Sequence, residues 1–117
     1  MRRSDAGLVA WGPLVPATFL ARPNRFLIVA RRSGRRVLAA CRDPGRLEHL
    51  LRPAVELRLM PARPGRRRTR FDVALVRSGR TWTSLIPVLA NRILEAAIVA
   101  GHVPGLSGAR VLAREPA

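Results

Sequence analysis

The residues with the clearest chemical potential lie in one short segment, Asp43-Pro44-Gly45-Arg46. Asp, Pro and Gly in this order are typical of a tight turn, in which Asp caps a backbone N–H, Pro fixes φ and Gly accepts a positive φ. Leucines spaced for one helical face follow between residues 47 and 51, which places a helix start and its N–H groups beside Arg46. Such an arrangement suits a phosphate, which arginine binds bidentately. The alternative is a loop-to-helix turn that binds nothing.

Arginines gather in two further places. One group lies between residues 63 and 70, in a loop rich in Pro and Gly, and the other surrounds the apolar run at residues 26–30. The alternative to an anion-binding role is a solvated basic surface. The residues that we predict to contact nucleic acid are Arg22, Arg25, Arg46, Arg66, Arg67, Arg68 and Arg70.

The charge of the chain supports this interpretation. The 117 residues carry a formal charge of +15, and all 22 basic residues are arginine. A GC-rich coding bias explains arginine in place of lysine, but it does not explain the shortage of acids. Residues 22–80 hold 17 of the arginines and four acids, whereas residues 81–117 are nearly neutral. Such a field attracts polyanions: DNA, RNA or an anionic membrane face.

The inventory for catalysis is poor. The seven acids are scattered, and His49 and His102 have no Cys or Asp near them in a metal-binding spacing. The single cysteine, Cys41, ends an apolar run and is expected in the core. Asp72 alternates with apolar residues and is expected to pair with Arg68 or Arg70. We therefore expect no enzyme activity, no metal and no cofactor.

Few aromatic side chains are available to stack on bases. Phe26 and Phe71 begin apolar runs and are expected in the core, whereas Trp82 lies between two threonines and is the best candidate for an exposed ring. Contacts to the phosphate backbone are therefore favoured over base readout, with strong dependence on salt.

The location follows from what the sequence lacks. It has no apolar run of 18 residues, no signal-peptide pattern and too few cysteines for a disulfide framework. These features predict a cytoplasmic protein without a membrane partner.

Most of the chain has the pattern of short strands. We expect strands at residues 8–20, 25–30, 36–41, 55–59, 71–76 and 81–86, a short helix at residues 46–51 and a helix at residues 91–100. Strands with close turns and one helix between the third and fourth predict a mainly β fold, a small five-stranded OB-like barrel followed by one trailing α-helix. SH3-like barrels and half-sandwiches give similar patterns.

The order of four motifs resembles the sugar fermentation stimulation protein family (SfsA). The motifs are R-x-x-RFL at residues 22–27, the turn at residues 43–47 with its leucines and Pro53, R-x-T-x-F-D at residues 67–72 and the helix at residues 91–98 with its Gly and Pro. The resemblance runs from about residue 7 to residue 115. The histidine that the family has near residues 40–42 is replaced here by Ala39-Ala40-Cys41-Arg42.

The resemblance implies an OB domain that binds DNA, followed by a nuclease-like domain with an acidic and lysine metal site. It assigns residues 7–86 to the OB-like domain and residues 87–117 to an incomplete start of the second domain, so that the chain reads as truncated before the catalytic strands. We expect a DNA-binding protein with little sequence specificity and, by resemblance, a regulatory role in sugar metabolism. The alternatives are a truncated nuclease-like enzyme fragment and an RNA-associated basic module. The apolar face of the helix at residues 91–100 predicts a homodimer or poor solubility.

Overall fold

Seven strands make up almost all of the regular structure in the part of the chain that the structure describes. The computed structural model describes residues 14–61, 69–86 and 110–113, with isolated positions at 92, 96, 98, 100–101 and 105–106. The strands are β1 (Val15–Asn24), β2 (Leu27–Arg32), β3 (Arg35–Ala40), β4 (Glu56–Pro61), β5 (Phe71–Ser78), β6 (Thr81–Ser84) and β7 (Arg110–Ala113).

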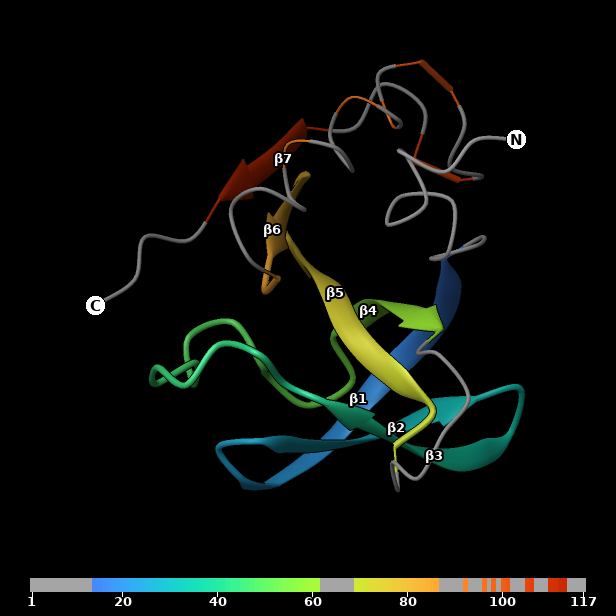
Figure 1. Ribbon diagram of the computed structural model, residues 1–117, viewed down its shortest axis with the longest axis vertical. Helices are drawn as coiled ribbons and strands as arrows, with labels where there is room; N and C mark the ends of the chain where they lie inside the picture. The colour runs from blue at the N-terminus through green and yellow to red at the C-terminus, as the bar shows by residue number, and fades with distance from the viewer. Residues whose placement is uncertain are drawn as a thin grey trace, which may run out of the picture.

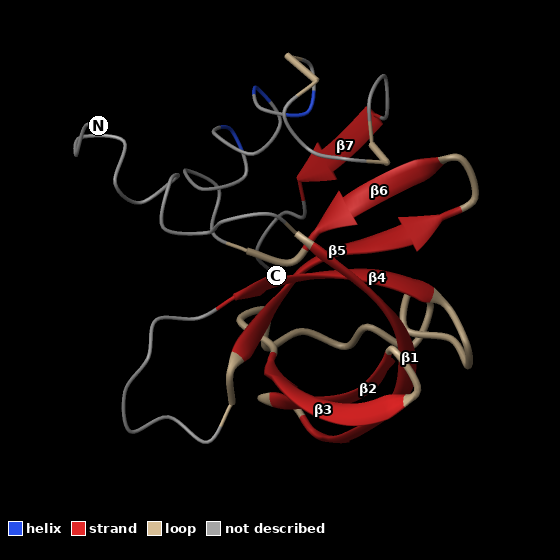
Figure 2. Ribbon diagram, turned by 90° about the vertical axis from the view of Figure 1, so that its right-hand side faces the viewer, coloured by secondary structure: helices blue, strands red, loops and turns tan. Residues whose placement is uncertain are grey.

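The first five strands close into a barrel (Figures 1 and 2). Their order is β3-β2-β1-β4-β5, and a parallel pairing of β3 with β5 through Ala39–Phe71 and Ala40–Asp72 completes the ring. All other pairings in the ring are antiparallel. This is the strand order of an OB fold, as the sequence pattern predicts.

Tight turns set the register of the barrel. Ser33 and Gly34 join β2 to β3, and both have positive φ, 52° and 79°. Positive φ at both central residues defines the turn whose twist matches that of the paired strands. Six consecutive pairs from Leu27–Ala40 to Arg32–Arg35 follow from it without interruption.

The barrel interior is filled by alternate side chains of the five strands. Ile28, Leu57, Leu59 and Val73 are fully buried there. Between β3 and β4 the predicted short helix is a single turn, in which the N–H groups of Leu50 and Leu51 donate to the carbonyl of Leu47 at 2.9 and 2.7 Å. Pro53 ends this turn by its missing N–H, and the three leucines are buried in the barrel core.

A second core lies on the other side of β5. A register shift opposite Arg58 and Leu59 leaves Ala74 without a cross-strand partner on β4. Such a bulge reverses the alternation of the strand. Val73 and Val76 consequently face the barrel core, whereas Ala74 and Leu75 face the second core with Trp82.

Two further strands, β6 and β7, follow the five strands of the barrel. β6 pairs with β5, and β7 then pairs with β6 in parallel, so the sheet continues beyond the barrel (Figure 2). The sequence pattern did not predict β7. In the helix expected at residues 91–100, Arg92, Ala96 and Ile98 have helical backbone and Ala100 lies in a turn, while the other positions lie outside the described residues. The start of the strand expected at residues 8–20 lies outside them as well.

Candidate nucleic-acid interface

Arg22 ties the end of β1 to the turn after β3. Its Nη1 donates to the carbonyl of Gly45 at 2.9 Å, and its Nη2 donates to the carbonyls of Arg25 and Asp43 at 2.8 and 3.1 Å. Its Nε is buried and has no partner among the described residues. The side chain is only partly exposed. Arg22 therefore positions two loops, a function that its place in a basic cluster did not suggest.

The Asp43–Gly45 turn holds itself together as well. The N–H of Gly45 donates to Oδ1 of Asp43 at 2.9 Å, the capping expected of Asp in a turn. Gly45 is not among the glycines with positive φ, and the predicted helix after it is the single turn described above. The predicted capping by Asp43 is therefore confirmed, the positive φ expected at Gly45 is wrong, and the exposed Arg46 lies beside the turn.

The other predicted contact residues fall into two groups, those that are exposed and those that lie outside the described residues. Arg25, Arg46 and Arg70 are exposed, and none of them forms an ion pair within the part of the chain that the structure describes. Arg66, Arg67 and Arg68 lie outside the described residues. Arg25 lies in the β1–β2 turn, and Arg70 comes directly before β5.

Four exposed arginines at the far end of the β2–β3 hairpin were not among the predicted contacts. Arg31 lies opposite Arg36, and Arg32 lies opposite Arg35, on either side of the two-residue turn. Like charges placed directly opposite each other on a sheet repel. None of the four has a carboxylate partner among the described residues. The strand register, read from the two-residue turn, is the signal that pairs them.

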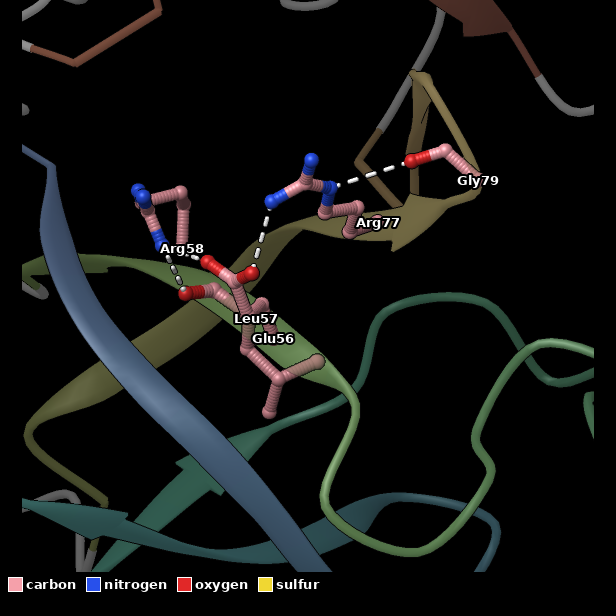
Figure 3. Close-up of polar contacts among 5 residues, drawn as sticks. All are labelled: Glu56, Leu57, Arg58, Arg77 and Gly79. Carbon is pink, nitrogen blue, oxygen red and sulfur yellow. Dashed lines mark hydrogen bonds and ion pairs between the residues drawn. The ribbon is translucent and has the colours of Figure 1, made fainter.

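Two arginines of the neighbouring strands share one carboxylate, that of Glu56. Nη1 of Arg77 on β5 lies 2.7 Å from Oε2 of Glu56 (Figure 3). Nη1 of Arg58 on β4 lies 3.7 Å from Oε1 of the same glutamate (Figure 3). Arg77 also donates through Nε to the carbonyl of Gly79 at 3.0 Å (Figure 3). Both guanidinium groups lie near the ring of Trp82, at 4.7 Å for Arg58 and 5.9 Å for Arg77. One carboxylate thus offsets part of the charge of two guanidinium groups on this side of the sheet.

Burial changes the acid–base behaviour of Arg58. Its side chain is 13% exposed, and desolvation lowers its pKa from the usual range. Glu56 opposes this effect, whereas Arg77 adds to it. A guanidinium stays protonated at neutral pH in spite of such a shift, so Arg58 is a structural cation here.

The two aromatic side chains on which the stacking argument depends are placed opposite to expectation. Trp82 is 5% exposed, because the face of β6 that alternation would give to solvent is covered by the second core. Phe26 is 65% exposed, because β2 begins only at Leu27 and leaves Phe26 at the corner of the turn. Its N–H donates to Oδ1 of Asn24 at 2.8 Å, which fixes that corner.

The remaining candidates for chemistry are used in the structure. Cys41 is buried, as predicted, and its Sγ donates to the carbonyl of Asp43 at 3.3 Å. Asp72 is buried and lies 3.4 Å from Nε of Arg42, a partner other than the predicted ones. Within the described residues, no three His, Cys, Asp or Glu side chains are grouped as metal ligands. In the same part of the chain, we find no helix with the length and apolar character needed to span a membrane.

The sequence matches known proteins over most of its length. Residues 20–85 match the family described as SfsA N-terminal OB domain. A sugar fermentation stimulation protein homolog of Moorella thermoacetica is 48% identical over 103 residues, covering 87% of this chain and 44% of the relative. The homolog of Chloroflexus aurantiacus is 40% identical over 97 residues, covering 83% of this chain and 38% of the relative.

A solved structure shows the same similarity in three dimensions. It is SfsA of Pyrococcus furiosus in complex with Ca²⁺, with a TM-score of 0.62 and 28% identity, covering 91% of this chain and 45% of that one. The chain thus spans less than half the length of the relatives that it matches. The strand order of the barrel, the match over residues 20–85 and these relatives lead to one conclusion: the chain belongs to the sugar fermentation stimulation protein (SfsA) family and contains its N-terminal OB domain.

Proposed function

We propose that the barrel binds DNA through the phosphate backbone with little sequence specificity. The main support for the proposal is that four arginines lie opposite one another at the end of the β2–β3 hairpin. They form two cross-strand pairs, Arg31–Arg36 and Arg32–Arg35. Their mutual repulsion would be relieved by an anion, and a polyanion brings several phosphates at once. Arg77 and Arg58 contribute less, because Glu56 already lies between them.

The predicted contacts extend this surface. Arg25, Arg46 and Arg70 are exposed and form no ion pair among the described residues. Arg66, Arg67 and Arg68 precede Arg70 in the sequence and lie outside the described residues. In OB folds, the face of the second and third strands and the adjoining loops bind nucleic acids. Arg22 is held by three carbonyls and would act on binding by positioning Arg25 and the Asp43–Gly45 turn.

The proposal includes the physiological role and the cellular location of the protein. The shared name of the relatives, sugar fermentation stimulation protein homolog, extends it to a regulatory role in sugar metabolism. A cytoplasmic location is part of the proposal, because the DNA of the prokaryotes in which the relatives occur lies in that compartment. The chain acts as a binder and not as an enzyme, and binding of this kind requires no cofactor.

The test is binding to labelled duplexes of unrelated sequence over a range of salt concentrations. We expect affinity to fall steeply with salt, because each neutralised phosphate releases counterions. Arg36→Gln should weaken binding to all duplexes alike, and Arg66, Arg67 and Arg68 changed together to Ala should weaken it further. Arg110→Gln on β7 is the matched control, since it removes the same charge outside the barrel.

Three results would contradict the proposal. They are no binding at low salt, equal effects of Arg36→Gln and Arg110→Gln, and a strong preference for RNA of the same sequence. Cleavage of the DNA by the pure chain with Mg²⁺ would contradict the statement that the chain is not an enzyme.

A further inference from the structure

Exposed apolar side chains gather on the same hairpin as the unpaired arginines. The described residues include three large hydrophobic side chains that are exposed, and two of them are Phe26 (65%) and Leu38 (39%). Phe26 lies in the turn before β2, and Leu38 lies on β3. A phosphate backbone makes no apolar contact with such side chains. Their exposure therefore favours a ligand that has apolar faces as well as negative charge.

The strand register places Leu38 and two of the exposed arginines, Arg31 and Arg36, in one row, and Phe26 directly precedes the first residue of β2. Ile28, Ala30 and Ala39 face the core, so the outward positions are their neighbours. We call this outward row the hairpin face. Its cross-strand pairs are Leu27–Ala40, Val29–Leu38 and Arg31–Arg36. The hairpin face is therefore apolar near the β1–β2 turn and basic near the β2–β3 turn.

The ring of Phe26 stands at the apolar end of the hairpin face on a fixed backbone. Its N–H donates to Asn24, and its carbonyl accepts from the N–H of Cys41 at 2.9 Å. Arg22 holds the neighbouring carbonyl of Arg25 at 2.8 Å. A ring that is already fixed loses little conformational entropy when a ligand stacks on it.

A hollow adjoins the hairpin face where β3 meets the start of β5. It has a volume of about 210 Å³ and is lined by Arg36, Val37, Leu38, Arg70 and Phe71. The guanidinium of Arg32 lies 5.8 Å from the ring centre of the partly exposed Phe71. Cationic and apolar side chains therefore both line this hollow.

Single-stranded DNA has the chemistry that matches this arrangement. Its bases present open π faces that stack on aromatic side chains, while its phosphates pair with arginine. In a duplex the base faces are already stacked on one another, so the apolar half of the hairpin face would gain no contact. Charge complementarity and the exposed ring together favour the single strand.

We propose that the hairpin face binds single-stranded DNA in preference to duplex DNA, with one base stacked on Phe26 and phosphates on Arg31 and Arg36. The proposal rests on the DNA-binding function proposed above and specifies the form of its ligand. The structure assigns a stacking role to a side chain that the sequence pattern places in the core.

The test compares a labelled single strand of about 12 nucleotides, within the range that OB folds cover, with the duplex of the same sequence. A third probe keeps the phosphates but carries abasic sites. The proteins are the wild-type chain, Phe26→Ala, Phe26→Trp and the control Leu112→Ala, which removes an exposed apolar side chain from β7.

We expect Phe26→Ala to weaken binding of the single strand by about 5- to 150-fold, the effect of losing one stacked base. Phe26→Trp should retain the affinity, and Leu112→Ala should leave it unchanged. The wild-type chain should bind the abasic probe as weakly as Phe26→Ala binds the intact strand. Circular dichroism will show whether Phe26→Ala is folded, and the abasic probe gives the same information without any mutation.

The failures of the two proposals are distinguishable. Binding of duplex as tight as that of single strand, with no effect of Phe26→Ala or of abasic sites, overturns this inference and leaves the DNA-binding proposal standing. Absence of binding to every probe at low salt overturns both.

Discussion

The guanidinium of Arg22 donates a hydrogen bond of 2.9 Å to the carbonyl oxygen of Gly45, 23 residues further along the chain. The bond joins the end of β1 to the loop after β3, and two more bonds from the same side chain reinforce it. A basic residue in a basic cluster is thus part of the scaffold.

Replacing Arg22 by Ala should lower the free energy of unfolding by about 2 kcal/mol, because a charged donor leaves three carbonyls at once. Urea denaturation gives the value. Arg25→Ala is the matched control: it removes the same charge from an exposed side chain in the adjacent turn. Equal midpoints for the two variants would show that the bonds of Arg22 contribute nothing.

Replacing Glu56 by Gln should lower the free energy of unfolding by about 1 kcal/mol at low salt, since Arg58 and Arg77 then face each other without a carboxylate. The loss should shrink at 1 M salt, where charges are screened beyond about 3 Å. Glu48→Gln, on an exposed turn, is the control. A loss that does not change with salt would point to packing and not to charge.

Cys41 should make stability depend on pH in the alkaline range. Burial raises the pKa of its thiol above the ordinary value, and the hydrogen bond to Asp43 only partly opposes this. The unfolded chain therefore loses this proton at lower pH than the folded one, so the stabilisation is complete below the unfolded pKa and declines as pH rises above it. The wild-type chain should lose more stability than Cys41→Ala between about pH 8 and pH 10. Parallel urea midpoints for both proteins over this range would refute the prediction.

Trp82 should be a principal support of the second core. Trp82→Leu removes part of a buried ring and the contact with Arg58 at 4.7 Å, so we expect a loss of about 2–4 kcal/mol. Thermal unfolding followed by circular dichroism measures it. Leu112→Ala, at a side chain that is 42% exposed, should cost less than about 1 kcal/mol. A Trp82→Leu variant as stable as Leu112→Ala would contradict the description of this core.

The barrel was predictable because its strands have a clear period of two and short turns. The pattern located β2 to β5 within a few residues and gave the OB topology. It placed β1 too early, since the observed strand runs from Val15 to Asn24. Ser33-Gly34 also fixed the pairing of the hairpin, because only a turn with positive φ at both residues connects these strands so closely.

The details that were missed depend on contacts distant in sequence or on single backbone irregularities. The bulge at Ala74 changes which residues of β5 face each of the two cores, and no periodicity reveals it. Phe26 has the same parity as the buried Ile28, and only the turn capped by Asn24 moves its ring outward. β7 has no signal of its own, since its place beside β6 comes from pairing across a long connection. The structural role of Arg22 was missed because its hydrogen bonds to the Asp43–Gly45 turn also join residues distant in sequence.

The bulge in β5 has a mechanical consequence. Val73 and Val76 belong to the barrel core, while Ala74 and Leu75 belong to the second core, so one strand forms a wall of both. Unfolding of either core would remove the packing of β5 from the other core. Separate unfolding of the two cores is therefore unfavourable. The amide hydrogens of β5 are accordingly expected to exchange with deuterated solvent only when the whole assembly of strands opens, as a single cooperative unit.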